Sequence, residues 1–163
     1  MAGLRLVILG VGNTLLGDEG FGVYVVRELE SRGLPAGVQV VEGGVGGFAL
    51  LDVLTSAPNV ILVDAADMGM EPGTLKRFTL DDADPESCEN KLSLHQVGLA
   101  DVLQMARALG CEPDLVIVGF QPATISPGDG ISPIARSKLS EAVQMVLDEV
   151  TLILTCGKQM EGV

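Results

Sequence analysis

The chain has 163 residues, of which 47% are hydrophobic, 20% charged and 3% aromatic, and its formal net charge at pH 7 is −12. This length suits a single hydrophobic core, and the hydrophobic content excludes an intrinsically disordered chain. The negative charge argues against a nucleic-acid partner, because phosphate binding depends on Lys and Arg. We therefore expect one α/β domain over residues 1–157 and a loose C-terminal tail over 158–163.

The first elements are a strand, a glycine-rich loop and a helix. Residues 4–9 form a continuous apolar run, which is typical of a strand covered on both faces. Apolar residues at helical spacing over 22–29 then predict a helix that ends at Gly33. Asp18 is the expected N-cap of this helix.

In the middle of the chain, predicted strands continue to alternate with predicted helices. A short apolar run at 38–41 predicts a second strand, and the segment 48–57 predicts a helix that ends before a proline. The apolar run 60–63 predicts a third strand, which ends at Asp64. Residues 74–80, where apolar and polar side chains alternate, predict a more exposed strand.

The last part of the chain predicts two helices around a buried strand. Ser93 to Gln96 fits a capping box, which would place His95 in the first turn of a helix that Gly110 closes. Residues 115–118 predict a buried strand, and the final helix begins at Pro133, a residue that suits the first helical position.

Strands that alternate with helices predict right-handed βαβ units and a parallel sheet. We therefore expect a three-layer α/β/α sandwich around a mostly parallel, twisted sheet of about five strands. Ligands in such sheets bind beyond the carboxyl ends of the strands, where the strand order reverses. If the first and third strands are neighbours, that crevice lies between the loops that carry Glu19 and Asp64.

Cysteine usage and hydropathy indicate the cellular compartment. The three cysteines are widely spaced and form neither a CxxC pair nor a disulfide framework. The short apolar run near the start predicts a strand rather than a signal peptide, and no stretch reaches about 18 apolar residues. We therefore expect a cytoplasmic protein without membrane insertion.

The loop GVGNTLLGDEGFG invites comparison with the dinucleotide fingerprint G-x-G-x-x-G. Gly10 and Gly12 fit, but Leu15 occupies the third glycine position, where a bulky side chain opposes close packing of helix on strand. A nucleotide-dependent enzyme is therefore disfavoured.

Four acids stand at positions where carboxylates acquire a role. Asp18 and Glu19 lie where the glycine loop enters a helix, whose dipole favours a nearby anion. We expect Asp18 to act as a cap and Glu19 to be functional. Asp64 ends an apolar strand, where burial is costly without a cation or hydrogen-bond donors. Asp67 is expected to be a solvated loop acid or a support behind the site.

His95 is the only histidine, so any imidazole-dependent step must use it. Together with Glu19 and Asp64 it supplies oxygen and nitrogen ligands that suit zinc, nickel or another divalent ion. Three ligands leave a coordination position open, either for a catalytic water or for a metal that another molecule presents. Spacing alone does not separate these alternatives.

Four segments taken together resemble the hydrogenase maturation endopeptidases: GVGNTLLGDEGFG, VEGGVGG, LVDAAD and NKLSLHQVGLADVL. The resemblance runs from about Arg5 to the last helix. It implies an α/β/α fold and places Glu19, Asp64 and His95 at the family's metal-contacting positions. It also implies that the substrate is the large-subunit precursor of a nickel-iron hydrogenase, from which the protease removes a C-terminal extension after nickel insertion. The substrate would then supply the nickel, although zinc or cadmium could fill the site in a crystal.

Two residues depart from the family pattern. Glu42 stands where Asp is usual before the paired glycines, and Val45 stands where Thr is frequent. A longer acid moves its carboxylate by about one bond length, and a displacement near 1 Å can cost about a hundredfold in rate.

On this resemblance we expect the nickel to fix the scissile peptide and to polarise its carbonyl group or a water, with Glu19 and Asp64 in the catalytic centre, in an aspartyl-protease type of reaction. Candidate bases are Asp18, Glu42 and Asp67, in falling order. Exposed apolar residues of the 120–131 loop either grip the substrate or pack as an ordinary loop. The alternative is a nickel carrier that uses the same three ligands and cuts nothing.

Overall fold

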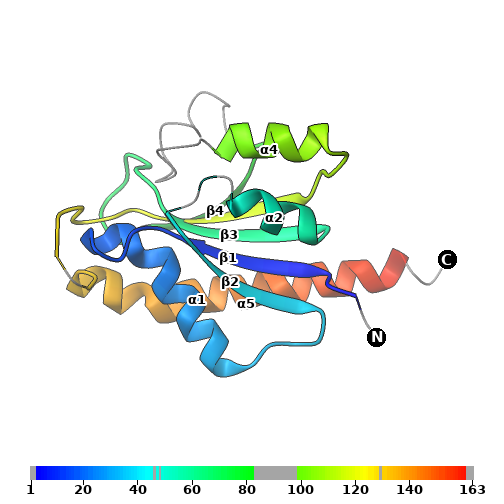
Figure 1. The fold of residues 1–163 in the computed structure, drawn as a ribbon. Helices are drawn as coiled ribbons and strands as arrows, with labels where there is room; N and C mark the ends of the chain where they lie inside the picture. Colours follow the sequence, from blue (N-terminus) through cyan, green and yellow to red (C-terminus); the bar gives the residue numbers. More distant parts are fainter. Residues whose placement is uncertain (1–2, 46, 48, 83–98, 129, 161–163) are drawn as a thin grey trace.

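A computed structural model of the chain describes residues 3–45, 47, 49–82, 99–128 and 130–160. Within these residues one sheet has the strand order β2-β1-β3-β5-β4 (Figure 1). The strands are β1 (Leu6–Val11), β2 (Val38–Gly44), β3 (Asn59–Ala65), β4 (Leu75–Thr79) and β5 (Asp114–Phe120). All pairings are parallel except that of β4, which lies antiparallel to β5 at the sheet edge. The mostly parallel sheet and the β1–β3 neighbourhood are thus confirmed.

Helices cover both faces of the sheet, which confirms the three-layer α/β/α sandwich (Figure 1). The helices are α1 (Phe21–Arg32), α2 (Ala49–Ser56), α4 (Leu99–Ala108) and α5 (Pro133–Met160), and a short 3-10 helix, η1 (Gly17–Gly20), precedes α1. Successive strand side chains point to opposite faces. In β1, Ile8 packs with residues of α1 and α5, and Val7 and Leu9 pack with those of α2 and α4.

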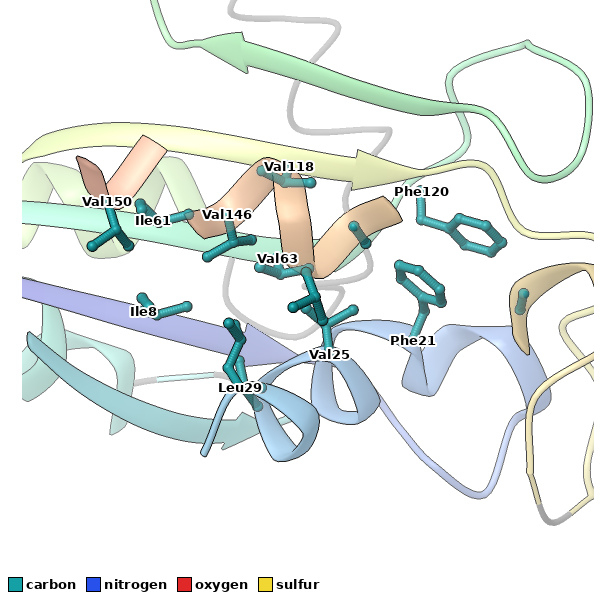
Figure 2. Close-up of a cluster of buried hydrophobic side chains, with 14 of the residues drawn as sticks. Ile8, Phe21, Val25, Leu29, Ile61, Val63, Val118, Phe120, Val146 and Val150 are labelled. Carbon is teal, nitrogen blue, oxygen red and sulfur yellow. The ribbon is translucent and has the colours of Figure 1, made fainter. Parts of the chain in front are cut away.

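The core on the α1 and α5 side includes an aromatic pair at the carboxyl edge of the sheet. Phe21, the first residue of α1, stacks on Phe120, the last residue of β5, with ring centroids 3.9 Å apart and an interplanar angle of 15° (Figure 2). Both rings are fully buried. The stack therefore fixes the start of α1 against the end of β5.

Most helix ends follow their predicted signals. Gly33 ends α1 with a φ of 73°, and Gly110 follows α4 with a φ of 81°. Pro133 is the first residue of α5, and the hydroxyl oxygen of Ser132 accepts a hydrogen bond from the amide of Ala135 at 3.2 Å, which caps this helix.

Three local predictions need correction. The N-cap of α1 is Gly20, without a side-chain cap, so Asp18 does not play that part. β3 continues through Asp64 to Ala65, because Asp64 still pairs with Gly119 of β5. α5 runs to Met160, three residues into the predicted tail, since Lys, Gln and Met favour helix and a single glycine costs only about 1 kcal/mol.

The predicted capping box at 93–96 and His95 lie outside the described residues. Among the helices that are described, none combines the length and the hydrophobicity needed to cross a membrane.

Candidate functional site

Glu19 and Asp64 lie on neighbouring elements at the carboxyl edge of the sheet. Glu19 belongs to η1, which packs against β3, and Asp64 is the penultimate residue of β3. Asp64 is completely buried and Glu19 is 8% exposed. Burying two carboxylates is costly unless hydrogen-bond donors or a cation compensate each of them. The arrangement therefore provides oxygen ligands of the kind that a divalent metal ion accepts.

Glycines in β1 and α1 allow this helix to pack closely on the sheet. A methyl group added at Gly22 would overlap the carbonyl oxygen of Val63 and lie 2.6 Å from that of Val11. A methyl group at Gly10 would overlap the carbonyl oxygen of Gly22. Backbone thus packs directly on backbone between α1 and the strands β1 and β3. Close packing of helix on strand occurs here at Gly10 and Gly22, whereas Leu15, where the dinucleotide fingerprint fails, is 66% exposed.

The buried carboxylate of Asp18 holds the loop that follows β5. Its Oδ2 accepts hydrogen bonds from the amides of Ala123 (2.9 Å) and Thr124 (3.3 Å) and from the hydroxyl of Ser132 (2.8 Å). Its Oδ1 accepts one from the amide of Ser132 at 2.7 Å. Three donors therefore converge on Oδ2 and one reaches Oδ1, so both oxygens of the buried carboxylate accept hydrogen bonds. Asp18 therefore anchors Ala123, Thr124 and Ser132 beside η1.

Gln121 was not predicted from the sequence to have a role. In the structure its side chain holds a loop by hydrogen bonds, as that of Asp18 does. Its side-chain oxygen accepts hydrogen bonds from the amides of Met68 (2.7 Å) and Met70 (3.3 Å), and its amide donates to Asp67 at 3.3 Å. These bonds hold the segment that follows Asp64. The usable signal was a polar residue directly after the apolar run of β5, the same signal that identified Asp64.

Glu42, a predicted catalytic acid, forms an ion pair with α1. The guanidinium of Arg27 donates to its two carboxylate oxygens at 2.7 and 3.2 Å. The hydrogen bond to Glu42 raises the pKa of Arg27 above its ordinary value. Both side chains are about half exposed, and Val45, the second departure from the family pattern, is 63% exposed.

The predicted metal set is described only in part. Two of its members, Glu19 and Asp64, lie on the contacting elements η1 and β3, whereas His95 lies outside the described residues. Within the part of the chain that the structure describes, no three His, Cys, Asp or Glu side chains are placed to share one ion. The complete three-ligand site therefore stays a prediction.

Residues 23–149 match a family described as "Hydrogenase maturation protease". The chain is 37% identical over 144 residues to "Hydrogenase expression/formation protein HupD" of Bradyrhizobium diazoefficiens, covering 86% of this chain and 75% of that protein. It is 38% identical over 147 residues to "Hydrogenase 2 maturation protease" of Escherichia coli, covering 88% and 89% of the two chains. The solved structure of the hydrogenase maturating endopeptidase HybD from E. coli superposes with a TM-score of 0.82 at 37% identity, covering 90% of this chain and 92% of that one.

Proposed function

The chain belongs to the hydrogenase maturation protease family and is a peptidase, and we propose that it removes the C-terminal extension from a nickel-loaded large-subunit precursor of a nickel-iron hydrogenase. The observation that carries the proposal is the pair of buried acids, Glu19 and Asp64, at the carboxyl edge of a sheet that superposes on a maturation endopeptidase. A dedicated protease of this kind needs a site that recognises a finished substrate, and carboxylate oxygens are ligands that a divalent cation accepts.

In the proposed reaction the precursor presents its own nickel. Carboxylate oxygens of Glu19 and Asp64 and a ring nitrogen of His95 bind this ion and thereby hold the adjacent peptide bond in place. The ion polarises the peptide carbonyl or the attacking water. Water adds to the carbonyl carbon, the C–N bond breaks, and the proton released by the water passes to the leaving amine.

The contacts of the candidate bases support a revised order among them. Both oxygens of Asp18 accept hydrogen bonds, from four donors in all, which supports a positioning role. Asp67 is exposed and binds Gly69 and Gln121. Glu42 is half exposed and pairs with one half-exposed cation, Arg27, so it can exchange that partner for a water. We therefore place Glu42 first, ahead of Asp18 and Asp67.

The free thiols of Cys111 and Cys156 support the cytoplasmic location that we propose, because a reducing compartment keeps cysteines unpaired.

Mass spectrometry of the precursor tests the function. We expect a discrete C-terminal loss after incubation of the nickel-loaded precursor with the wild-type protein, and an unchanged mass for the nickel-free precursor. Transfer of nickel without any change in precursor mass would instead identify a carrier. His95→Ala should abolish cleavage while the circular dichroism spectrum stays that of the wild type, and full retained cleavage would refute the ligand assignment.

A further inference from the structure

Two loops at the carboxyl edge are joined into one unit, which we call the double loop and define as residues 13–18 and 123–128. The amide of Gly128 donates to the carbonyl oxygen of Leu15 at 3.0 Å, and Leu16 and Gly128 form an isolated parallel bridge. The amide of Asp18 donates to the carbonyl oxygen of Thr124 at 3.0 Å. With the carboxylate bonds of Asp18, these contacts fix both loops although each lies at the surface.

Close backbone contact between the loops also requires a glycine. Gly17 has a φ of 60°, and a methyl group there would lie 2.9 Å from the carbonyl oxygen of Thr124. A left-handed backbone and this short distance both favour glycine. The two loops are therefore held in one arrangement by local sequence as well as by hydrogen bonds.

The double loop exposes large apolar side chains on an uncharged surface. Leu15 is 66% exposed and Ile125 is 56% exposed. The sequence has no charged residue between Arg5 and Asp18 or between Asp114 and Asp129, and the side chain of Asp18 is fully buried. The two stretches are therefore uncharged within a chain whose formal net charge is −12.

We propose that the double loop is a docking surface for an uncharged, apolar segment of the precursor polypeptide, which Leu15 and Ile125 grip. The occupant follows from position. Leu15 and Asp18 lead directly into Glu19, and residues 123–128 follow the end of β5, the strand that pairs with the Asp64 strand. A peptide bond held at Glu19 and Asp64 therefore leaves its flanking chain across these loops. Because the occupant is the precursor, this surface depends on the proposed function.

The absence of charged residues on the double loop indicates which kind of peptide segment can bind there. With no exposed charge on the double loop, neither a basic nor an acidic peptide gains an ion pair there, whereas apolar side chains gain burial against Leu15 and Ile125. Fixed loops also lose little conformational entropy when they bind, so the contact area converts into affinity more fully than on a flexible surface.

Kinetics with the nickel-loaded precursor and binding of the nickel-free precursor test the surface together. The test variant is Leu15→Ser with Ile125→Ser, and the matched control is Leu109→Ser with Leu152→Ser. Leu109, which directly follows α4, is 66% exposed, and Leu152, in the second half of α5, is 58% exposed. The C-terminal ends of both helices lie away from the carboxyl edge of the sheet (Figure 1). We expect the test variant to raise KM and the Kd of the nickel-free precursor by about tenfold, with kcat within about twofold. The control should match the wild type in all three.

The proposal that the double loop is a docking surface would be contradicted by unchanged KM and Kd in the test variant, or by an equal rise in the control. A loss confined to kcat would likewise overturn it, because it would place the loops in the chemistry rather than in docking. If the wild type leaves the precursor uncut, the proposed function fails on its own. The Kd comparison then still decides whether the double loop binds this polypeptide.

Discussion

Gly22 in α1 lies directly against the carbonyl oxygen of Val63, the residue before Asp64 in β3. This contact sets how closely the helix that follows Glu19 approaches the strand that carries Asp64. No side chain larger than hydrogen fits between the two backbones. The glycine therefore allows α1 to lie close to β3 just after Glu19 and just before Asp64.

Gly22→Ala should destabilise the protein and impair cleavage. Alanine favours helix over glycine by about 1 kcal/mol, but overlap with two carbonyl oxygens costs about 1–3 kcal/mol or more, so the overlap should prevail. Urea unfolding would measure the loss, and cleavage of the nickel-loaded precursor would report the displaced Glu19. Gly3→Ala is the control, since a methyl group there meets nothing within 4 Å. A variant at Gly22 as stable as the wild type would show that the backbones can separate at no cost.

Asp18→Asn should destabilise the protein by about 3 kcal/mol. Four donors converge on the carboxylate, and an amide group would point its own N–H bonds at some of them. Chemical denaturation would measure the change. The alternative view of Asp18, as a catalytic base, predicts lost cleavage with unchanged stability.

Ser132 offers a milder test of the same anchor. Its hydroxyl donates to Asp18 and accepts from the amide of Ala135, so Ser132→Ala should cost about 1–2 kcal/mol. Ser132→Thr retains the hydroxyl and should restore most of the stability. Ser137→Ala removes an exposed hydroxyl on the same helix and should change stability by less than about 0.5 kcal/mol.

Glu42→Gln should lower kcat by about a hundredfold if Glu42 moves a proton in the reaction. Stability should change by less than about 1 kcal/mol, because the ion pair with Arg27 is half exposed. Arg27→Met breaks the same pair but keeps the carboxylate, and it should retain kcat. Equal losses in the two variants would assign Glu42 a structural role instead.

The elements of this fold could be predicted because their signals are local. Apolar runs located the strands, and Gly33 and Gly110 located two helix ends, since each acts within a few residues of its own position. Glu19 and Asp64 could be placed at one edge because parallel strands bring their carboxyl ends together.

The role of Asp18 could not be predicted in this way. Its position before a helix suggested a cap, which is a local interaction, whereas its partners Ala123 and Ser132 lie in the loop after β5. Gln121 was overlooked for the same reason, because its partners Met68 and Met70 belong to the β3–β4 connection. Contacts between loops that are distant in the sequence depend on the strand order of the sheet, and the spacing of residues along the chain does not reveal that order.

The carboxylate of Asp82 should contribute to the stability of the folded protein in a way that depends on pH. The backbone amide and the hydroxyl of Thr79 donate to its carboxylate and hold its pKa below the ordinary value of 3.8. A lowered pKa gives a contribution that is present above about pH 3.8 and is lost as pH falls through the folded-state pKa. Asp82→Asn should therefore be less stable than the wild type at neutral pH, with the difference shrinking in acid. A difference that stays constant with pH would contradict this.

The ion pair of Arg77 and Glu149 ties the edge strand β4 to α5. The guanidinium of Arg77 donates to both carboxylate oxygens at 2.7 and 2.8 Å, and the Glu149 side chain is only 8% exposed. The hydrogen bond to Glu149 raises the pKa of Arg77, so this group stays charged throughout the working range. Removing one partner should therefore cost more than the pair itself contributes, because the other charge remains in place.

Glu149→Gln should destabilise the protein by about 2 kcal/mol, a value that allows for the 45% exposure of the Arg77 side chain. The double variant Arg77→Met with Glu149→Leu should recover most of this loss, because it leaves no charge behind. Glu141→Gln breaks an exposed pair with Lys138 on the same helix and should change stability by less than about 0.5 kcal/mol. Thermal or urea unfolding of the wild type, Arg77→Met, Glu149→Leu and the double variant measures the double-mutant cycle. Additive losses in the double variant would mean that Arg77 and Glu149 act independently, and the edge strand would then be held by its pairing with β5 and by the packing of Leu75 and Phe78.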